Sequence, residues 1–343
     1  MPLRVDDCMG IMAEIAPPEY AESWDPVGLQ VGHPQQPVRR MGVALDATFE
    51  VVSEAIQEGV DFLVVHHPLF FRPLKNLDLG APAGRIIGAA VRNSLSIYAA
   101  HTNLDSVPGG LNDALCQKIG LARIEPLTEG KKRSQTLLHV EVPAKMKDRV
   151  HRLFEETDGG VVWWASMDTE GVIGRARLAT DRVRGIRARL HALCPEARVD
   201  GIPAGEILSG AGLGRVGDLP GPLCLEAFAE KTKKDLDLTH VRMVGDPMRA
   251  VRRVAVCTGS GAGLMSDALK AGADVLLTGD VKYHEAMEVL DQGFSLVDAG
   301  HFGTESMVVD LLVERLAGAL KARDIQGVGI VPFSSRKDPF LTV

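Results

Sequence analysis

Histidine and carboxylate residues recur at matching places in two distant parts of the chain. The segment Ile97–Asp105 (IYAAHTNLD) aligns with Val297–Glu305 (VDAGHFGTE), and each contains a histidine followed four positions later by a carboxylate. His101 therefore corresponds to His301, and the carboxylate that ends one segment corresponds to the one that ends the other. Because each segment begins with an apolar, strand-like run, these polar groups are expected at matching strand ends. The repeat predicts a pseudo-symmetric site between two related halves.

A second alignment extends the repeat and adds candidate ligands. Glu54–His67 (EAIQEGVDFLVVHH) aligns without gaps with Asp267–Asp280 (DALKAGADVLLTGD), and Asp61 matches Asp274. In open α/β sheets, ligands bind beyond the carboxyl ends of the strands. The polar side chains expected to converge on one such rim are His66, His67, His101, Asp105, Asp280 and His301.

The residue types on this rim favour a metal centre. Imidazole and carboxylate groups without cysteine suit zinc, iron, manganese or a similar divalent ion. If His301 opens the final helix, Glu305 lies one turn later on the same face and reaches the same centre. The adjacent His66 and His67 must be splayed, which favours two ions about 3.5–4 Å apart, bridged by Asp105 or Glu305. A lone strand-end histidine is more often structural, so the prediction depends on the whole combination.

The elements that must position these residues are short apolar strands alternating with helices, typical of α/β domains with a largely parallel sheet. In the N-terminal part, strands are predicted at Met41–Asp46, Asp61–Val65 and Leu95–Ala100, with helices over Thr48–Gly59 and near Arg85. In the C-terminal part, strands are predicted at Arg253–Cys257, Asp274–Leu277 and Phe294–Asp298, followed by a long final helix from about Thr304.

The middle of the chain has a different pattern. Thr136–Val142 predicts a strand and Ala144–Thr157 a helix, and another helix is predicted by an apolar stripe at Val183, Ile186, Leu190 and Leu193. A small ferredoxin-like α+β insert fits this pattern. The predicted domains are therefore an N-terminal α/β half over 1–125, an insert over 126–246 and a C-terminal α/β half over 247–343.

Composition bounds the class of protein. The chain has 343 residues, 45% apolar and 24% charged, which indicates an ordinary globular protein of about two domains. The net charge of −7 disfavours a chain-wide nucleic-acid surface but leaves a local basic patch open. There is no apolar run of about 18 residues, and Asp6 and Asp7 interrupt a possible signal peptide, so a cytoplasmic protein without membrane contact is expected. The 5 cysteines are scattered, which argues against a disulfide framework or a thiolate zinc site.

In the segments that carry the histidines and carboxylates, the chain resembles the GTP cyclohydrolase I type 2 family, also called the NIF-three-like dinuclear-metal proteins. The resemblance spans almost the whole chain, including GLGRVGDL (Gly212–Leu219), which is similar to the end of the PII/CutA-like domain of longer members. The other matching segments are WDPVGLQVG (Trp24–Gly32), HHPLFF (His66–Phe71), HTNLDSVPGGLND (His101–Asp113), GSG (Gly259–Gly261), LTGDVKYHEA (Leu277–Ala286) and DAGHFGTE (Asp298–Glu305).

The resemblance implies a site and an assembly. The family's ligand positions for two metal ions fall on His66, His67, Asp105, His301 and Glu305. His101 and His284 lie in the same motifs and are hypothesised to orient groups or transfer protons, and Trp24 and Asp25 are expected to line the cleft. A homohexamer built as a trimer of dimers, with a PII/CutA-like insert, is the implied architecture. The chain departs from the family at Pro26, where asparagine is usual, and at Phe302, where tyrosine is common.

The implied function is metal-assisted hydrolysis of GTP, in which water attacks the purine imidazole ring. His101 or His284 would transfer protons, and Lys282 or the Gly259 loop would bind the triphosphate. Gly259, Gly261 and Gly263 are equally compatible with a plain tight turn. The alternative is a metal-binding or regulatory ring with little turnover that binds a partner, a small ligand or nucleic acid.

Overall fold

The computed structural model describes residues 3–129, 132–155, 163–166, 171–180, 183–207, 210–334 and 338–341. The chain divides into two compact units. One unit combines Met1–Glu129 with Gly210–Val343, and the other is Gly130–Ser209. The fold is mixed α/β, with two sheets in the first unit and one in the second.

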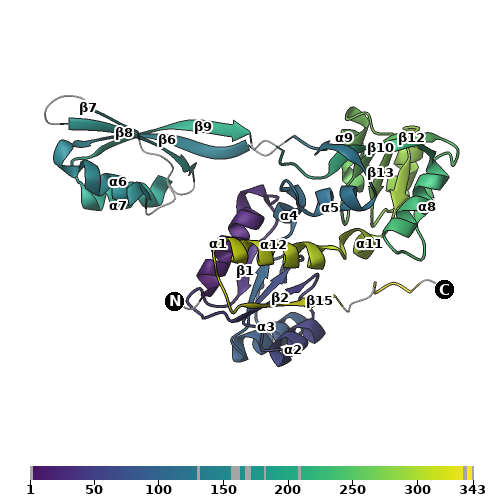
Figure 1. The fold of residues 1–343 in the computed structure, drawn as a ribbon, viewed down its shortest axis with the longest axis horizontal. Coiled ribbons are helices and arrows are strands. Elements are labelled where there is room, and N and C mark those ends of the chain that lie inside the picture. Colours follow the sequence, from purple (N-terminus) through teal and green to yellow (C-terminus); the bar gives the residue numbers. More distant parts are fainter. Residues whose placement is uncertain are drawn as a thin grey trace. The chain divides into compact units, whose positions relative to one another are not determined.

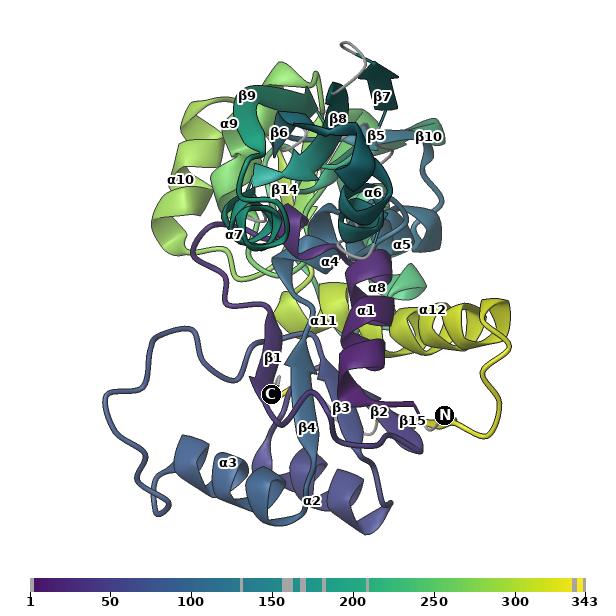
Figure 2. The same ribbon diagram turned by 90° about the vertical axis from the view of Figure 1, so that its left-hand side faces the viewer.

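The first sheet has the strand order β1 (Gly28–Val31), β4 (Ser96–Ala99), β3 (Phe62–Val65), β2 (Arg40–Ala44) and β15 (Gly329–Phe333). The last four are parallel, and β1 is antiparallel to β4. One face is covered by α2 (Phe49–Gln57) and α3 (Pro82–Arg92), and the other by α1 (Val5–Ile15) and α12 (Val308–Ala322) (Figures 1 and 2). Side chains alternate between the two cores along β3, which explains why the sequence of this strand is continuously apolar.

The second sheet has the order β11 (Arg242–Val244), β14 (Leu296–Asp298), β13 (Val275–Thr278), β12 (Ala250–Val256), β10 (Arg215–Cys224) and β5 (Ala122–Pro126). Strands β12, β13 and β14 are parallel, and the other pairings are antiparallel. One core contains α5 (Leu111–Lys118) and α8 (Leu225–Asp235), and the other contains α9 (Met265–Lys270) and α10 (Tyr283–Asp291). The short helices α4 (Thr102–Ser106) and α11 (His301–Glu305) lie between the two sheets (Figures 1 and 2).

The two sheets share a strand order. An antiparallel strand is followed by three parallel ones in both β1-β4-β3-β2 and β11-β14-β13-β12. The aspartates matched by the sequence alignment also make matching bonds. Asp61 Oδ2 accepts hydrogen bonds of 2.8 and 3.2 Å from the backbone N–H groups of Arg39 and Arg40, at the start of β2. Asp274 Oδ2 accepts bonds of 2.8 and 2.9 Å from two successive N–H groups of β12.

The second unit contains one antiparallel sheet. Its order is β7 (Trp163–Ser166), β8 (Gly171–Ala179), β6 (Lys132–Pro143) and β9 (Arg198–Ile207). The helices α6 (Lys147–Glu155) and α7 (Val183–Leu193) share an apolar core with this sheet. Ile186 and Leu190 are buried in this core, so the predicted apolar stripe is a helix with one inward face.

Most predicted strands and helices are observed, with three differences. Residues 210–246, predicted to belong to the insert, lie with the second sheet, because β10 pairs with β12 and α8 packs on the same sheet. The predicted final helix is two helices, since α11 ends at Glu305 and α12 begins at Val308. The residues between them, Ser306 and Met307, include no glycine or proline that would mark a break in the sequence. The predicted helix Ala144–Thr157 begins with a 3₁₀ turn and continues as α6 to Glu155, and Thr157 lies outside the described residues.

Within the described ranges, no helix is both long and apolar enough to cross a membrane.

Candidate metal centre

Histidine and carboxylate side chains from both sheets of the first unit converge at the carboxyl ends of the parallel strands. His66 and His67 directly follow β3, and His101 lies between β4 and α4. His301 and Glu305 are the first and last residues of α11, which follows β14. These side chains form two groups, and within each group the potential ligand atoms all lie within 4.8 Å of one another. One group is His66, His67 and His101, and the other is His67, His301 and Glu305. His67 belongs to both groups and joins them.

Glu305 is the hub of this cluster. Its side chain is only 3% exposed, and its Oε2 lies 2.9 Å from His67 Nε2 and 3.0 Å from His301 Nε2. Its Oε1 lies 3.7 Å from His66 Nε2, and the Nε2 atoms of His67 and His301 are 3.2 Å apart. The helical spacing of His301 and Glu305 therefore aims both side chains at one centre, as the sequence predicted.

Asp105 approaches the cluster from α4. Its Oδ1 lies 3.7 Å from His66 Nε2 and accepts a 3.2 Å hydrogen bond from Thr258 Oγ1. Asn112 donates a 3.1 Å bond to the backbone oxygen of Asp105, and its own Oδ1 accepts a 2.9 Å bond from Thr258 N. Because Thr258 follows β12, these bonds fix the Asp105 carboxylate against the end of the second sheet.

In two of the four histidines, a carboxylate behind the ring is hydrogen-bonded to Nδ1. His67 Nδ1 is 2.8 Å from Asp46 Oδ1, and His301 Nδ1 is 2.7 Å from Asp280 Oδ2. Metal-binding histidines are commonly oriented in this way, with one nitrogen bonded to a carboxylate and the other facing the metal. Asp280 was expected on the rim from sequence, whereas Asp46 was not selected. Its position at the end of the predicted strand Met41–Asp46 was the signal that could have identified it.

The other two histidines are held in a related manner. His101 Nδ1 lies 3.0 Å from Asp25 Oδ2, and that oxygen also accepts a 3.0 Å hydrogen bond from Thr102 N. His66 Nδ1 is bonded to the backbone oxygen of Ala100 at 2.8 Å. Asp25, expected to line the cleft, therefore orients His101 from behind.

The electrostatics of the cluster are those of a cation site. Burial alone raises the pKa of Glu305, but hydrogen bonds from the surrounding histidines outweigh it and hold that pKa well below its usual range. Burial lowers the pKa of His67, yet Asp46 and Glu305 raise it to about 10. The hydrogen bond to Glu305, opposed by burial and assisted by Asp280, raises the pKa of His301 to about 9. Without a metal, protons supply the positive charge that these carboxylates require.

His66 provides the test of whether the residues fit a metal ion. The side chain is fully buried, and because its Nδ1 is bonded to a backbone oxygen, its Nε2 faces Asp105 and Glu305. This Nε2 makes no hydrogen bond, since both carboxylates are 3.7 Å away. A buried polar atom without a partner beside two carboxylates is an arrangement that a coordinated cation satisfies. The histidine and glutamate groups are therefore positioned to hold a metal ion.

His284 is not part of the cluster. It lies in α10 with an exposed side chain, and its ring packs against that of Tyr283 at a centroid distance of 5.4 Å. Among the residues that the structure describes, no hydrogen bond or ion pair joins His284 to the cluster. Lys282, a predicted phosphate ligand, is exposed and pairs with Glu285 of the same helix at 3.7 Å. The structure thus brings together the five predicted ligands and His101, but not His284 or Lys282.

Two exposed aromatic side chains flank His101. Trp24 and Phe71 are 60% and 55% exposed, and their ring centroids lie 6.0 and 5.7 Å from that of His101 in edge-to-face arrangements. Exposed aromatic surface next to a polar cluster is available for stacking on a planar ligand.

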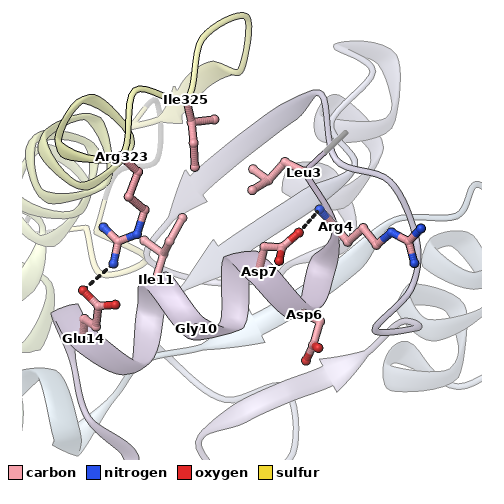
Figure 3. A pocket seen from close by; sticks show the side chains of 9 residues that line it. All are labelled: Leu3, Arg4, Asp6, Asp7, Gly10, Ile11, Glu14, Arg323 and Ile325. Carbon is pink, nitrogen blue, oxygen red and sulfur yellow. Dashed lines mark hydrogen bonds and ion pairs between the residues drawn. The ribbon is translucent and has the colours of Figure 1, made fainter. Parts of the chain in front are cut away.

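A cavity of about 630 Å³ lies away from this chemistry, between α1 and the segment that follows α12 (Figure 3). Arg323 forms an ion pair with Glu14 there, and Asp7 accepts a 2.8 Å hydrogen bond from the backbone N–H of Arg4. None of the cluster residues lines this cavity. This cavity is therefore not part of the candidate metal site.

The fold and the site together define a class of protein. It is an α/β protein in which histidine and carboxylate side chains between two sheets are positioned to hold a metal ion. The family model described as Duf34/NIF3 (NGG1p interacting factor 3) matches residues 3–339, and the chain belongs to this family. A Bacillus subtilis relative named GTP cyclohydrolase 1 type 2 homolog is 30% identical, with 96% of each chain covered. A Halalkalibacterium halodurans relative of the same name is 32% identical, with 95% of each chain covered. The crystal structure of a Bacillus cereus protein related to NIF3 matches with a TM-score of 0.79 and 30% identity, over 100% of both chains.

Proposed function

We propose that this protein is a dinuclear-metal-dependent hydrolase. The proposed metal ligands are His66, His67, Asp105, His301 and Glu305. The position of Glu305 carries the proposal, because one of its oxygens faces His66 while the other contacts both His67 and His301. A carboxylate shared between two sets of ligands is the arrangement expected of a bridged two-metal site.

The proposed reaction is hydrolytic opening of the purine imidazole ring of GTP. The substrate is suggested by the name of the curated relatives, GTP cyclohydrolase 1 type 2 homolog. Two bound divalent ions, with zinc, iron or manganese as candidates, would supply Lewis acidity and lower the pKa of water. His101, oriented by Asp25, would transfer a proton, and the exposed rings of Trp24 and Phe71 would pack on the base.

The site is built from two similar halves of the first unit. We infer that the halves are pseudo-symmetric, since both sheets share a strand order and place a histidine after the third parallel strand. We also infer that the insert is ferredoxin-like and related to PII/CutA domains. Its element order β6-α6-β7-β8-α7-β9 and its sheet order β7-β8-β6-β9 support this inference. A homohexamer built as a trimer of dimers is proposed on the family resemblance.

A second candidate function is a metal-binding or regulatory ring with little turnover. The insert favours it, because Gly130–Ser209 forms a compact unit with its own apolar core and supplies none of the cluster residues. Such a unit is suited to binding a small ligand, a partner or nucleic acid. Fold alone does not decide between this function and hydrolysis.

One experiment separates the two candidates. Bound metal and GTP turnover are measured in the same samples of the wild-type protein, Asp105→Ala and the control Asp310→Ala, which removes an exposed carboxylate of α12. The hydrolase proposal expects about two ions per chain, turnover in the wild type and the control, and loss of both properties in Asp105→Ala. Full metal content with intact GTP would favour the regulatory ring. Unchanged metal content and turnover in Asp105→Ala would refute the proposed site.

A further inference from the structure

A second cavity adjoins the metal-type cluster. It has a volume of about 320 Å³, and Asp46 and His67 form part of its lining. Other parts of the lining come from the start of α2, including Phe49, and from α3, including Arg85. The cavity therefore connects a proposed metal ligand to a basic side chain of another element.

Arg85 is held in place by Phe49. The guanidinium carbon of Arg85 lies 4.3 Å from the centroid of the Phe49 ring. Stacking on the ring fixes the plane of the guanidinium and leaves the N–H groups at its edge available to an acceptor. Phe49 is itself 36% exposed, so the stacked pair lies at the surface of the cavity rather than in the apolar core.

Arg85 also lacks an acidic partner. Within the described ranges, no Asp or Glu forms an ion pair with Arg85, whereas Arg215, Arg242 and Arg253 of the same unit each pair with a carboxylate. Among the described residues that line the cavity, Asp46 is the only acidic one, and its side chain is bonded to His67. The guanidinium is therefore free to bind an anion that enters the cavity.

Another cavity of the same unit has the reverse charge. A cavity of about 410 Å³ is lined by residues of α9 and α10, including Glu285 and Glu288. Lys282 is already paired with Glu285. Charge therefore favours an anionic group beside Arg85 and disfavours one beside α10.

We propose that Arg85, stacked on Phe49, is the anchor for a phosphate group of the ligand whose reacting part occupies the metal centre. A planar guanidinium binds phosphate oxygens through two parallel N–H···O bonds, which gives both affinity and orientation. The shared residue His67 places this anion subsite next to the cluster. The inference rests on the proposed function for the identity of the ligand, and it assigns the phosphate end to α3 rather than to Lys282 or the Gly259 loop.

Equilibrium dialysis of the full-length protein tests the anchor, with GTP, inorganic pyrophosphate and guanosine as probes and with bound metal measured in every sample. Arg85→Ala is expected to weaken binding of GTP and pyrophosphate at least about tenfold, equivalent to about 1.4 kcal/mol, and to leave guanosine binding unchanged. Arg85→Lys, which keeps the charge but loses the planar fork, is expected to give an intermediate loss. The control Arg92→Ala removes the same charge from the last turn of α3 and is expected to bind all probes like the wild type.

Three outcomes would overturn the anchor. These are equal GTP affinity in the wild type and Arg85→Ala, an equal loss of guanosine and GTP binding, and failure of the wild type to bind GTP or pyrophosphate. Since Arg85 is exposed, thermal unfolding of Arg85→Ala should match that of Arg92→Ala, which separates lost binding from lost folding. The metal content of Asp105→Ala is independent of these results, so failure of the anchor is distinguishable from failure of the proposed metal site.

Discussion

Loading the cluster with a divalent ion should release protons. In the metal-free protein the pKa of His67 is about 10 and that of His301 is about 9, so both rings carry a proton at pH 7. Both rings direct Nε2 at Glu305, and each must lose a proton before that atom can bind a metal. Glu305 adds no proton to the exchange, because the histidines hold its pKa well below the usual range.

His67 and His301 set the minimum size of the effect, because the pKa values of two further proposed ligands, His66 and Asp105, are also raised. At least about two protons should leave each chain on full loading at pH 7, and each displaced proton changes the apparent affinity about tenfold per pH unit. His67 and His301 alone should therefore raise metal affinity about 100-fold per pH unit from near neutrality to pH 9. Between pH 9 and 10 their contribution to the slope should fall as His301 and then His67 lose their protons.

A titration counts these protons directly. Zinc chloride is added to chelator-treated, full-length protein in weakly buffered solution at pH 7, and the base needed to hold the pH is recorded. Apparent affinity is measured in parallel at several pH values by competition with a chromophoric chelator. His301→Ala should release about one proton fewer, while His284→Ala, altered outside the cluster, should behave like the wild type. Release of less than one proton, or an affinity independent of pH, would refute the reasoning.

Three further substitutions test the packing around the site. Asp113→Ala should destabilise the protein by about 3 kcal/mol in urea unfolding, because it leaves the buried Arg215 guanidinium without its carboxylate. Gly259→Ala should lower bound metal, measured by elemental analysis, because φ is +63° and the new Cβ would collide with Glu305 Oε1. Trp24→Ala should leave metal content unchanged but weaken GTP binding severalfold in equilibrium dialysis, because it removes a 60% exposed ring from beside the cluster.

Matched variants isolate the cause in each case. Gly272→Ala introduces the same backbone strain at φ +71° with nothing within 4 Å of the new Cβ, so its metal content should be normal. Equal metal loss in Gly259→Ala and Gly272→Ala would show that strain, rather than contact with Glu305, is responsible. An Asp113→Ala protein as stable as the wild type would contradict the importance of the Arg215 pair, and metal loss in Trp24→Ala would contradict a role limited to ligand stacking.

The parallel strands in the interior of the two sheets were predictable because each contains a short apolar run that is buried on both faces. The prediction at Asp61–Val65 differs from β3 by one residue at its start, and the prediction at Asp274–Leu277 differs from β13 by one residue at each end. The two edge strands of the first sheet, β1 and β15, were not predicted, and both are only partly buried. β1 (GLQV) has no continuous apolar run, and β15 (GIVPF) contains Gly329 and Pro332, which are typical of loops. The assignment of β10 to the second sheet depends on its pairing with β12, which local sequence does not encode.

The candidate site was predictable to a similar extent. The histidines and carboxylates could be selected because they follow strand runs and recur in the internal repeat. The groups that orient them were harder to identify, since an aspartate at a strand end, such as Asp46, has many ordinary uses. The anion subsite at Arg85 had no sequence signal, because it depends on a side chain stacking on Phe49 from another helix.

The sequence by itself determined the strand ends and the spacing of His301 and Glu305, because burial periodicity and helical geometry act over a few neighbouring residues. Only the tertiary structure decided that His67 and His301, 234 positions apart, bring their Nε2 atoms within 3.2 Å. It also decided that Asp46 and Asp280 lie behind those rings and that Glu305 joins three histidines. These contacts depend on how two sheets pack around α4 and α11, and packing between distant segments is set by the whole core rather than by any local pattern.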